Sequence, residues 1–460
     1  MIRLMFEQND TICAVATPTG GALTIIRISG KNAVAAAEMV FTPKSGAVLS
    51  GLAPYSTVFG TIRAADGSIL DEAMATVFRA PHSYTGEDSV EFSCHGSTFI
   101  AQQVMSLLIM HGCRQAFPGE FTQRAFLSGK MDLSQAEAVA DLIASTSAAS
   151  HRLAMNQMKG GFSQRLRALR DQLLELTSLM ELELDFSEED VNFADRSHLD
   201  AIAADIETTL TTLSDSFRTG DAIRNGIPVA IVGRTNTGKS TLLNLLLNDD
   251  RALVSDIQGT TRDSIEDTAS INGTLFRFID TAGIRQSDDT IEQLGIERSF
   301  QKVSQSDIVL WLADCFNPET MHDPELEERL LPLCHDRILI RIFNKCDLLG
   351  TCPTISSNSV YISAKHDINI GSLKQMLVDS APKFTSGGDD VIVTNIRHFQ
   401  AINHALDCII RTRSGLSAGT PTDLISQDTR EAIHHLSDIL GEVTTDQVLG
   451  NIFSRFCIGK

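Results

Sequence analysis

The spacing of apolar residues changes along the chain. Up to about residue 128, short β-branched runs at 23–28 and 89–92 alternate with turns containing Gly and Pro, which is typical of a compact α+β domain. From 129 to 222, apolar residues recur at steps of three and four, as one face of a helix requires. The residues that form these helical faces are Leu166, Leu169, Leu173, Leu176 and Met180, followed by Leu199, Ile202, Ile206, Leu210, Leu213 and Phe217.

A third pattern occupies 223–381. Short apolar runs there alternate with helical segments, which predicts a mostly parallel sheet wound with crossover helices. These runs are 228–232, 275–279, 308–312, 338–343 and 360–362. After a glycine-rich acidic stretch, 386–390, the remainder of 382–460 is again helical. We therefore expect a multidomain α/β protein in which the last helices pack against 129–222 and the α/β domain is an insertion.

Composition and charge narrow the choice of function. The chain is 43% hydrophobic and 21% charged, as in ordinary globular proteins. No apolar stretch approaches the length of about 20 residues that spans a bilayer, and the start lacks a signal-peptide hydrophobic region. We expect a cytoplasmic protein that does not enter a membrane. The net charge of −20 argues against a surface that grips nucleic acid everywhere, so any RNA contact must be local or shared with a basic partner.

Cysteine usage gives no sign of covalent or metal cross-links. The nine cysteines are scattered, odd in number and never spaced as C-x-x-C. We therefore expect neither disulfides nor structural zinc.

The sequence GRTNTGKS at 233–240 carries the clearest chemistry. It fits G-x-x-x-x-G-K-[ST] and stands between an apolar run and a helix-like TLLNLLL, as a phosphate-binding loop requires. Its glycines allow backbone N–H groups to curl around phosphates. Lys239 would reach the outer phosphates, and the Ser240 hydroxyl would ligate Mg²⁺.

Three further motifs follow at the ends of predicted strands. In DTAG, 280–283, the aspartate can hold Mg²⁺ through water and the glycine N–H can sense the γ-phosphate. In NKCD, 344–347, a carboxylate can accept from guanine N1–H and the exocyclic amine, which adenine does not offer. SAK, 363–365, would pack against the base. Together with the first motif, they predict a G domain that hydrolyses GTP.

The predicted nucleotide-binding residues come from these motifs and from the segment 255–261. They are Asn236, Thr237, Gly238, Lys239, Ser240, Thr241, Ser255, Asp256, Ile257, Gln258, Gly259, Thr260, Thr261, Asp280, Thr281, Ala282, Gly283, Asn344, Lys345, Asp347, Ser363, Ala364 and Lys365.

The group that orients the attacking water is not evident from these motifs. Many G domains use a Gln directly after D-x-x-G, but this position is Ile284. A substitute must come from elsewhere in the chain or from a partner. The carboxylates of 286–292 and the threonines of GTTRD, 259–263, are candidates, although solvated loop charges are the simpler interpretation.

The chain ends in FCIGK. Its terminal Lys460 and the lack of a preceding polybasic stretch argue against prenylation of Cys457. Two interpretations remain: a packed small hydrophobe or a reactive thiol at an interface.

Beyond these motifs, the chain resembles the MnmE (TrmE) family of bacterial tRNA-modification GTPases. The likeness includes DTICAVATP, IIRISG, SYTGEDSVEFSCHG, PGEFTQRAFLSGKMDLSQAEAVADLI and the terminal FCIGK. It implies an N-terminal folate-binding-like domain that also dimerises (1–128), a discontinuous helical domain (129–222 and 382–460), and an inserted G domain (223–381). In such proteins the G domains dimerise when potassium and GTP are bound.

The resemblance also assigns the cations and the water-orienting group. It implies a Mg²⁺ site at Ser240 and Thr261, and a K⁺ site at Asn236 and Thr260 with the backbone around Ser255 and Ile257. The K⁺ ion would neutralise charge as an arginine finger does. Glu292 matches the family's water-orienting glutamate, which answers the problem raised by Ile284.

In the N-terminal domain, the resemblance implies that Arg27, Glu87 and Lys130 bind a one-carbon folate, either 5-formyl- or methylene-tetrahydrofolate. A carboxylate suits the pterin N–H edge and cations suit the glutamate tail. Three positions depart from the family pattern: 17–23 reads TPTGGAL, one residue shorter and without an arginine; Thr235 replaces a proline; and 94–97 reads CHGS.

Family members act as homodimers with an MnmG-type flavoprotein, which carries FAD. Together they install a carboxymethylaminomethyl-type group on C5 of the wobble uridine of certain tRNAs. The acidic chain fits this division of labour, because the partner can supply basic surface for tRNA. The match to the family's terminal cysteine makes Cys457 a candidate catalytic residue.

Two other functions remain as alternatives. A regulatory GTPase that binds ribosomes or ribosomal RNA shares a segment like GTTRD, but no second G domain or KH-type module follows here. A membrane-remodelling GTPase would need a basic amphipathic helix, which the chain lacks.

Overall fold

The computed structural model describes residues 10–185, 196–248, 267–279, 302–349, 358–381, 391–454 and 456–459. It divides into two compact units. Unit 1 comprises Met1–Ala140, Gln157–Leu199 and Ser414–Lys460, and unit 2 comprises Asp141–Asn156 and Asp200–Arg413. Across the described residues, no helix combines the length and the apolar character needed to cross a bilayer.

Unit 1 contains a seven-stranded sheet in the order β3-β4-β5-β6-β2-β1-β7. Neighbouring strands are antiparallel except β1 and β7. The strands are β1 (Thr11–Val15), β2 (Leu23–Ser29), β3 (Phe41–Pro43), β4 (Ser56–Arg63), β5 (Ile69–Phe78), β6 (Ser89–His95) and β7 (Cys113–Gln115). The predicted runs at 23–28 and 89–92 are therefore strands, as expected.

Helices α1 (Ala33–Val40) and α2 (Thr98–Met110) cover one face of this sheet. The side chains of Ile26 and Phe92 are fully buried in the cluster that contains Val34 and Val104. Because side chains alternate along a strand, Arg27 lies on the opposite face, away from these helices.

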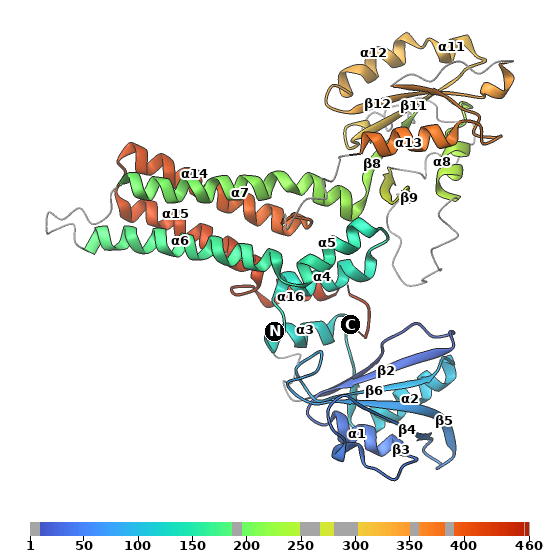
Figure 1. Cartoon of the computed structure of the whole chain (residues 1–460), viewed down its shortest axis with the longest axis vertical. Coiled ribbons are helices and arrows are strands. Elements are labelled where there is room, and N and C mark those ends of the chain that lie inside the picture. The colour runs from blue at the N-terminus through green and yellow to red at the C-terminus, as the bar shows by residue number, and fades with distance from the viewer. Residues whose placement is uncertain are drawn as a thin grey trace. The chain divides into compact units, whose positions relative to one another are not determined.

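The remaining helices of unit 1 come from two parts of the sequence, 120–185 and 422–453. They are α3 (Glu120–Leu127), most of α4 (Leu133–Ala144), α6 (Gly161–Asp185), α15 (Thr422–Leu440) and α16 (Asp446–Phe453). Helices α6 and α15 lie side by side (Figure 1), joined by a 2.9 Å hydrogen bond between Thr177 and Thr429. The predicted face from Leu166 to Met180 is buried. The last helices therefore pack against an earlier helical segment, as expected.

Unit 2 repeats this pairing with α7 (Arg196–Asn225) and α14 (Ile396–Ala418), while α5 (Ala148–Met158) lies mostly in the same unit. The Ser214 hydroxyl donates to Asn403 at 2.7 Å. Phe217 stacks on Phe399 with ring centroids 4.2 Å apart. Phe217 and Ile202 are only half-buried, so the second predicted face is less deeply covered than the first.

The α/β domain lies wholly within unit 2. Its six-stranded sheet has the order β13-β12-β11-β8-β10-β9, and every pair is parallel except β9 with β10. The strands are β8 (Ile227–Val232), β9 (Asp267–Ile271), β10 (Thr274–Phe278), β11 (Ile308–Asp314), β12 (Ile338–Asn344) and β13 (Ser359–Tyr361). The five predicted strands are present, and the sequence patterns missed the antiparallel strand β9.

Helices cover both faces of this sheet. Residues of α8 (Lys239–Asn248) and α13 (Ile370–Ser380) share one buried cluster with Val229 and Ile231. Leu330 of α12 (Pro324–Leu333) packs on the other face with Trp311. The short helix α11 (Pro318–Met321) precedes α12. Since β8, β11 and β12 are parallel, their carboxyl ends meet at one edge, where ligands bind in open α/β sheets.

Candidate functional site

The loop between β8 and α8 closes on itself through its own hydrogen bonds. Lys239 Nζ donates to the carbonyl oxygens of Gly233 at 2.7 Å and Arg234 at 2.6 Å. The Thr237 hydroxyl also donates to the Arg234 carbonyl, at 2.9 Å. Asn236 adopts a left-handed conformation with φ 61°, which asparagine tolerates better than most residues. The chain is thus coiled around the amino group of Lys239, as a phosphate-binding loop requires.

Burial lowers the pKa of Lys239 to about 8, because removal from water disfavours the charged form of a lysine. At neutral pH the side chain is still mainly a cation. A poorly solvated cation gains more from a neighbouring phosphate than an exposed one does. The loop is therefore suited electrostatically to a polyphosphate.

Asn344 connects three of the predicted motifs. Its Nδ2 donates to the Thr237 carbonyl at 2.8 Å, and its Oδ1 accepts from the Ala364 N–H at 3.0 Å. A Cβ atom on Gly238, where φ is +97°, would stand 2.1 Å from Asn344 Nδ2. Only glycine fits at this close approach. The structure thus brings the phosphate-binding loop, NKCD and SAK together.

The rest of NKCD follows directly after the end of β12 at Asn344. Lys345 takes a left-handed conformation with φ 68°, and its ammonium lies 2.6 Å from Asp314. Asp347 lies in a single 3₁₀ turn, Cys346–Leu348, which the Cys346 N–H fastens to the Ile362 carbonyl at 3.0 Å. The Asp347 carboxylate lies 3.7 Å from His366 Nε2, so it is close to the SAK segment.

Two other predicted residues of this site begin α8. Ser240 is half-buried and Thr241 is exposed. Several predicted site residues lie outside the described residues. These are Ser255, Asp256, Ile257, Gln258, Gly259, Thr260, Thr261, Asp280, Thr281, Ala282, Gly283 and Glu292.

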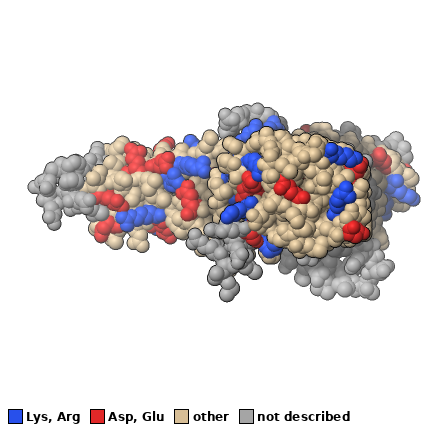
Figure 2. All heavy atoms as spheres, turned by 90° about the horizontal axis from the view of Figure 1, so that it is seen from below, with Lys and Arg blue, Asp and Glu red and all other residues tan. Residues whose placement is uncertain are grey.

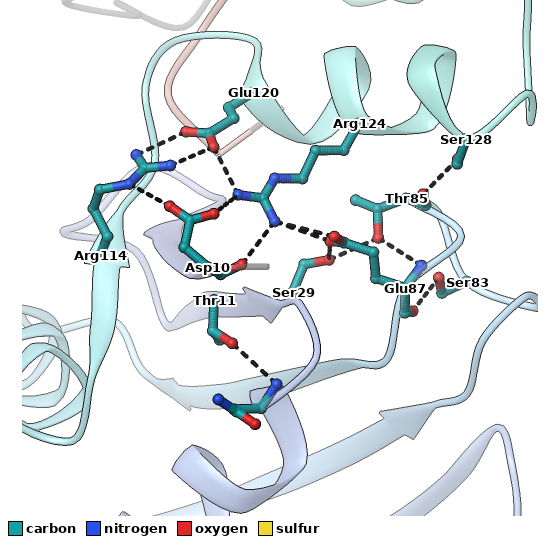
Figure 3. Close-up of polar contacts among 11 residues, drawn as sticks. Asp10, Thr11, Ser29, Ser83, Thr85, Glu87, Arg114, Glu120, Arg124 and Ser128 are labelled. Carbon is teal, nitrogen blue, oxygen red and sulfur yellow. Dashed lines mark hydrogen bonds and ion pairs between the residues drawn. The ribbon is translucent and has the colours of Figure 1, made fainter. Parts of the chain in front are cut away.

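A second candidate site lies in the N-terminal domain, at a chain of charged residues shown in Figure 3. Arg124 of α3 donates to Asp10 at 2.5 Å, to Glu120 at 2.9 Å and to Glu87 at 3.1 Å. Arg114 joins the same network, contacting Asp10 at 2.7 Å and Glu120 at 2.6 Å. The Glu120 side chain is only 1% exposed. Its two arginine partners therefore compensate a buried carboxylate.

Glu87 stands at the exposed end of this network. Its Oε2 accepts from the Ser29 hydroxyl at 2.8 Å, and Arg124 holds both of its carboxylate oxygens. The side chain of Glu87 retains 28% exposure. A carboxylate fixed in this way keeps acceptor capacity for an N–H donor from outside.

Arg27 and Lys130 lie around the same region. Arg27 and Ser29 share one face of β2, and Arg27 contacts Glu91 at 2.8 Å. Lys130 Nζ donates to the Pro81 carbonyl at 2.9 Å, at the start of the 81–88 loop that carries Glu87. All three predicted folate-binding residues are therefore gathered near this loop.

The C-terminal tail reaches the same surface of the domain. The Gly459 carbonyl accepts from Arg27 Nη1 at 3.3 Å, and the Cys457 carbonyl accepts from the Gly119 N–H at 3.4 Å. Phe456 is buried beside Phe453 and Leu133. Cys457 itself is exposed. Its interpretation as a packed small hydrophobe is wrong, because Phe456 fills the apolar cluster and turns the next side chain outward.

The loop 17–23 and the turn 94–97, both of which depart from the family pattern, contact each other. The Gly20 N–H donates to the Gly96 carbonyl at 2.8 Å, and the Gly96 N–H donates to the Ala22 carbonyl at 3.1 Å. A Cβ on Gly96 would stand 2.0 Å from the Gly21 carbonyl. The shortened 17–23 loop is thus closed against the CHGS turn by backbone bonds.

Together, the fold and the first site define a P-loop G domain inserted in a discontinuous helical domain. The MnmE helical domain model matches residues 133–457, and the model of the GTP-binding protein TrmE N-terminus matches 11–130. The chain therefore belongs to the MnmE family of tRNA-modification GTPases, and it is a GTP hydrolase.

Individual relatives agree along nearly the whole chain. The tRNA modification GTPase MnmE of Bacteroides fragilis is 56% identical over 469 residues, covering 98% of this chain and 100% of the relative. That of Porphyromonas gingivalis is 47% identical over 468 residues, covering 98% of each.

Among solved structures, Era in complex with MgGDPNP and part of 16S ribosomal RNA is 26% identical. The matched region covers 39% of this chain and 66% of the Era chain, with a TM-score of 0.27. The FeoB G-domain from Methanococcus jannaschii is 23% identical. The matched region covers 34% of this chain and 97% of the FeoB chain, with a TM-score of 0.25. The chain belongs to its family on the strength of the two family models and the sequence relatives, and these structures add nothing to that.

Proposed function

We propose that this chain couples GTP hydrolysis to modification of C5 of the wobble uridine of certain tRNAs, in the cytoplasm and with a flavin-containing partner. Family membership carries the GTPase activity and the role in tRNA modification. The observation that most directly supports nucleotide binding is the pair of Asn344 hydrogen bonds to Thr237 and Ala364. They join the phosphate and base halves of one site.

The described residues of the G domain have distinct roles in this proposal. Lys239 and the backbone amides of its loop bind the outer phosphates of GTP. Ser240, with Thr261, ligates Mg²⁺, which neutralises developing charge on the phosphates. Asp347 accepts hydrogen bonds from guanine, which selects GTP over ATP.

The residues that carry out hydrolysis are proposed from the family resemblance. Glu292 orients the attacking water in place of Ile284. Asn236, together with Thr260 and the backbone of Ser255 and Ile257, holds K⁺, which compensates transition-state charge.

The N-terminal domain supplies a folate site in this proposal. Glu87 accepts from the pterin N–H edge, while Arg27 and Lys130 attract the carboxylates of the glutamate tail. The gathering of these residues around the 81–88 loop supports the assignment. The exposed thiol of Cys457, on the tail held by Arg27, is the candidate catalytic group.

We further propose that the chain is a homodimer and that an MnmG-type flavoprotein carrying FAD completes the enzyme. The sheet face opposite α1 and α2 supports dimerisation, because it presents the cross-strand pair Phe59 and Met74, which are 40% and 39% exposed. On the face shown in Figure 2, basic and acidic residues are interspersed. With a net charge of −20, the chain gains tRNA affinity from a basic partner.

The direct test is GTP turnover in KCl and in NaCl at equal ionic strength. We expect K⁺ to raise the rate by about tenfold or more. We also expect Glu292→Ala to lose hydrolysis and still bind nucleotide, whereas Glu297→Ala, a nearby acidic control, should keep its rate. Equal rates in the two salts would remove the K⁺ site from the proposal.

A further inference from the structure

Arg234 in the phosphate-binding loop is fixed through both its main chain and its side chain. Its carbonyl oxygen accepts from Lys239 Nζ at 2.6 Å and from the Thr237 hydroxyl at 2.9 Å. Its guanidinium makes a two-pronged contact with Asp323, with Nε to Oδ2 at 2.5 Å and Nη2 to Oδ1 at 3.0 Å. One residue thus connects the interior of the loop to a carboxylate outside it.

Asp323 is itself rigidly placed. Its side chain is 2% exposed and also accepts from the Leu326 N–H at 3.2 Å, which caps the first turn of α12. Helix α12 is anchored through the fully buried Leu330, which packs with Trp311 of β11. The hydrogen bond from Arg234 lowers the pKa of Asp323, so the carboxylate is ionised at neutral pH. The sheet therefore provides a fixed anchor for Arg234.

We propose that Arg234 and Asp323 form a clamp that holds the phosphate-binding loop in the shape that places Lys239. A planar guanidinium bound at two points has little freedom to rotate. The carbonyl of the same residue is then fixed in direction, and this carbonyl holds the Lys239 amino group. Both members of the clamp are positioning residues, since they act on the phosphates through Lys239.

The base half of the site is held by contacts in which neither Arg234 nor Asp323 takes part, namely the Asn344 bond to Ala364 and the Cys346 bond to Ile362. The clamp therefore affects phosphate binding and leaves guanine binding intact. General damage to the domain would weaken both. The affinities for GDP and for guanosine consequently distinguish a positioning role from a merely structural one.

The principal test uses Asp323→Asn in the full-length chain. Asparagine keeps the shape of the side chain and caps a helix as well as aspartate does, but it loses the charge and one acceptor of the two-pronged contact. We expect GDP affinity to fall by about tenfold and guanosine affinity to stay unchanged, measured by displacement of a fluorescent GDP analogue.

A matched control removes a different ion pair from the same helix. Glu327 of α12 lies 3.6 Å from Arg341 and does not touch the loop. Glu327→Gln should leave the affinities for GDP and guanosine unchanged.

A second variant tests the need for two contact points. Arg234→Lys keeps the charge but not the planar fork, so it should lose about as much GDP affinity as Asp323→Asn. The double variant should be no weaker than either single one, because both break the same contact. Wild-type GDP affinity in Asp323→Asn, an equal loss for guanosine, or additive losses would each overturn the proposal.

Discussion

The phosphate-binding loop and the N-terminal network hold their cations in opposite ways. Lys239 meets two main-chain carbonyls and, among the described residues, no carboxylate. Arg124 contacts three carboxylates, those of Asp10, Glu87 and Glu120. Burial lowers the pKa of Lys239 to about 8. Burial also works against the charged form of Arg124, but its carboxylate partners raise the pKa above the usual value.

This difference decides what each site can bind. An uncompensated, partly desolvated cation favours an anion such as a polyphosphate. A compensated network attracts anions weakly, but it holds one carboxylate, Glu87, in place for a hydrogen-bond donor. The two sites are thus suited to different ligands, a nucleotide in one case and, in our proposal, a pterin-like ring in the other.

The largest expected effect comes from removing the uncompensated cation. Lys239→Ala should weaken GTP binding by about a hundredfold, because charged hydrogen bonds to phosphate are lost. Equilibrium titration with a fluorescent GTP analogue measures this change. Thermal unfolding without nucleotide serves as the control. It should show little change in stability, since the desolvation cost of the cation and its two hydrogen bonds are lost together. Near-normal affinity would show that Lys239 does not contact phosphate.

Removal of the compensated cation should instead act on stability. Arg124→Met leaves Glu120 and Asp10 with Arg114 as their remaining partner in the network, which should cost about 2–3 kcal/mol in the free energy of unfolding. Lys44→Met is the matched control, because it breaks an exposed ion pair with Glu72 in the same domain and should cost less than about 1 kcal/mol. Denaturant unfolding followed by circular dichroism compares them, and equal losses would contradict the importance of the buried network.

The smallest expected effect concerns the close approach between the two halves of the nucleotide site. Gly238→Ala should lower GTP affinity, because its Cβ would collide with Asn344 Nδ2. The same collision should lower the free energy of unfolding by about 1–3 kcal/mol. Gly273→Ala is the control: its φ of +81° is similarly unfavourable, but nothing lies within 4 Å of its Cβ. If both variants retain full GTP affinity, the contact with Asn344 does not shape the site.

The sequence predicted the meeting of three nucleotide-binding motifs far better than it predicted the N-terminal network. GRTNTGKS, NKCD and SAK follow local rules, and their meeting follows from parallel strands, although Asn344 and Thr237 are 107 positions apart. No comparable rule pairs Arg124 with Asp10, 114 positions away. The run PGEFTQRAF carried the family resemblance, but it gave no sign that Glu120 is buried or that Arg124 holds Glu87.

The clamp and one strand were missed for similar reasons. Asp323 reads as an ordinary helix cap before a proline, and its contact with Arg234 depends on how α12 packs on the sheet. Strand β9 has only five residues, too few for a clear alternation. The domain boundaries at 128, 222 and 381 remain predictions.

The proposed role in tRNA modification is tested most directly by nucleoside analysis of tRNA. The cells lack this chain and are complemented with the wild-type protein or with Lys239→Ala. We expect C5-modified wobble uridines to disappear in the deletion strain. The wild-type protein should restore them and Lys239→Ala should not, because nucleotide binding at that lysine drives the modification. Unchanged wobble uridines in the deletion strain, or full restoration by Lys239→Ala, would contradict the proposed role.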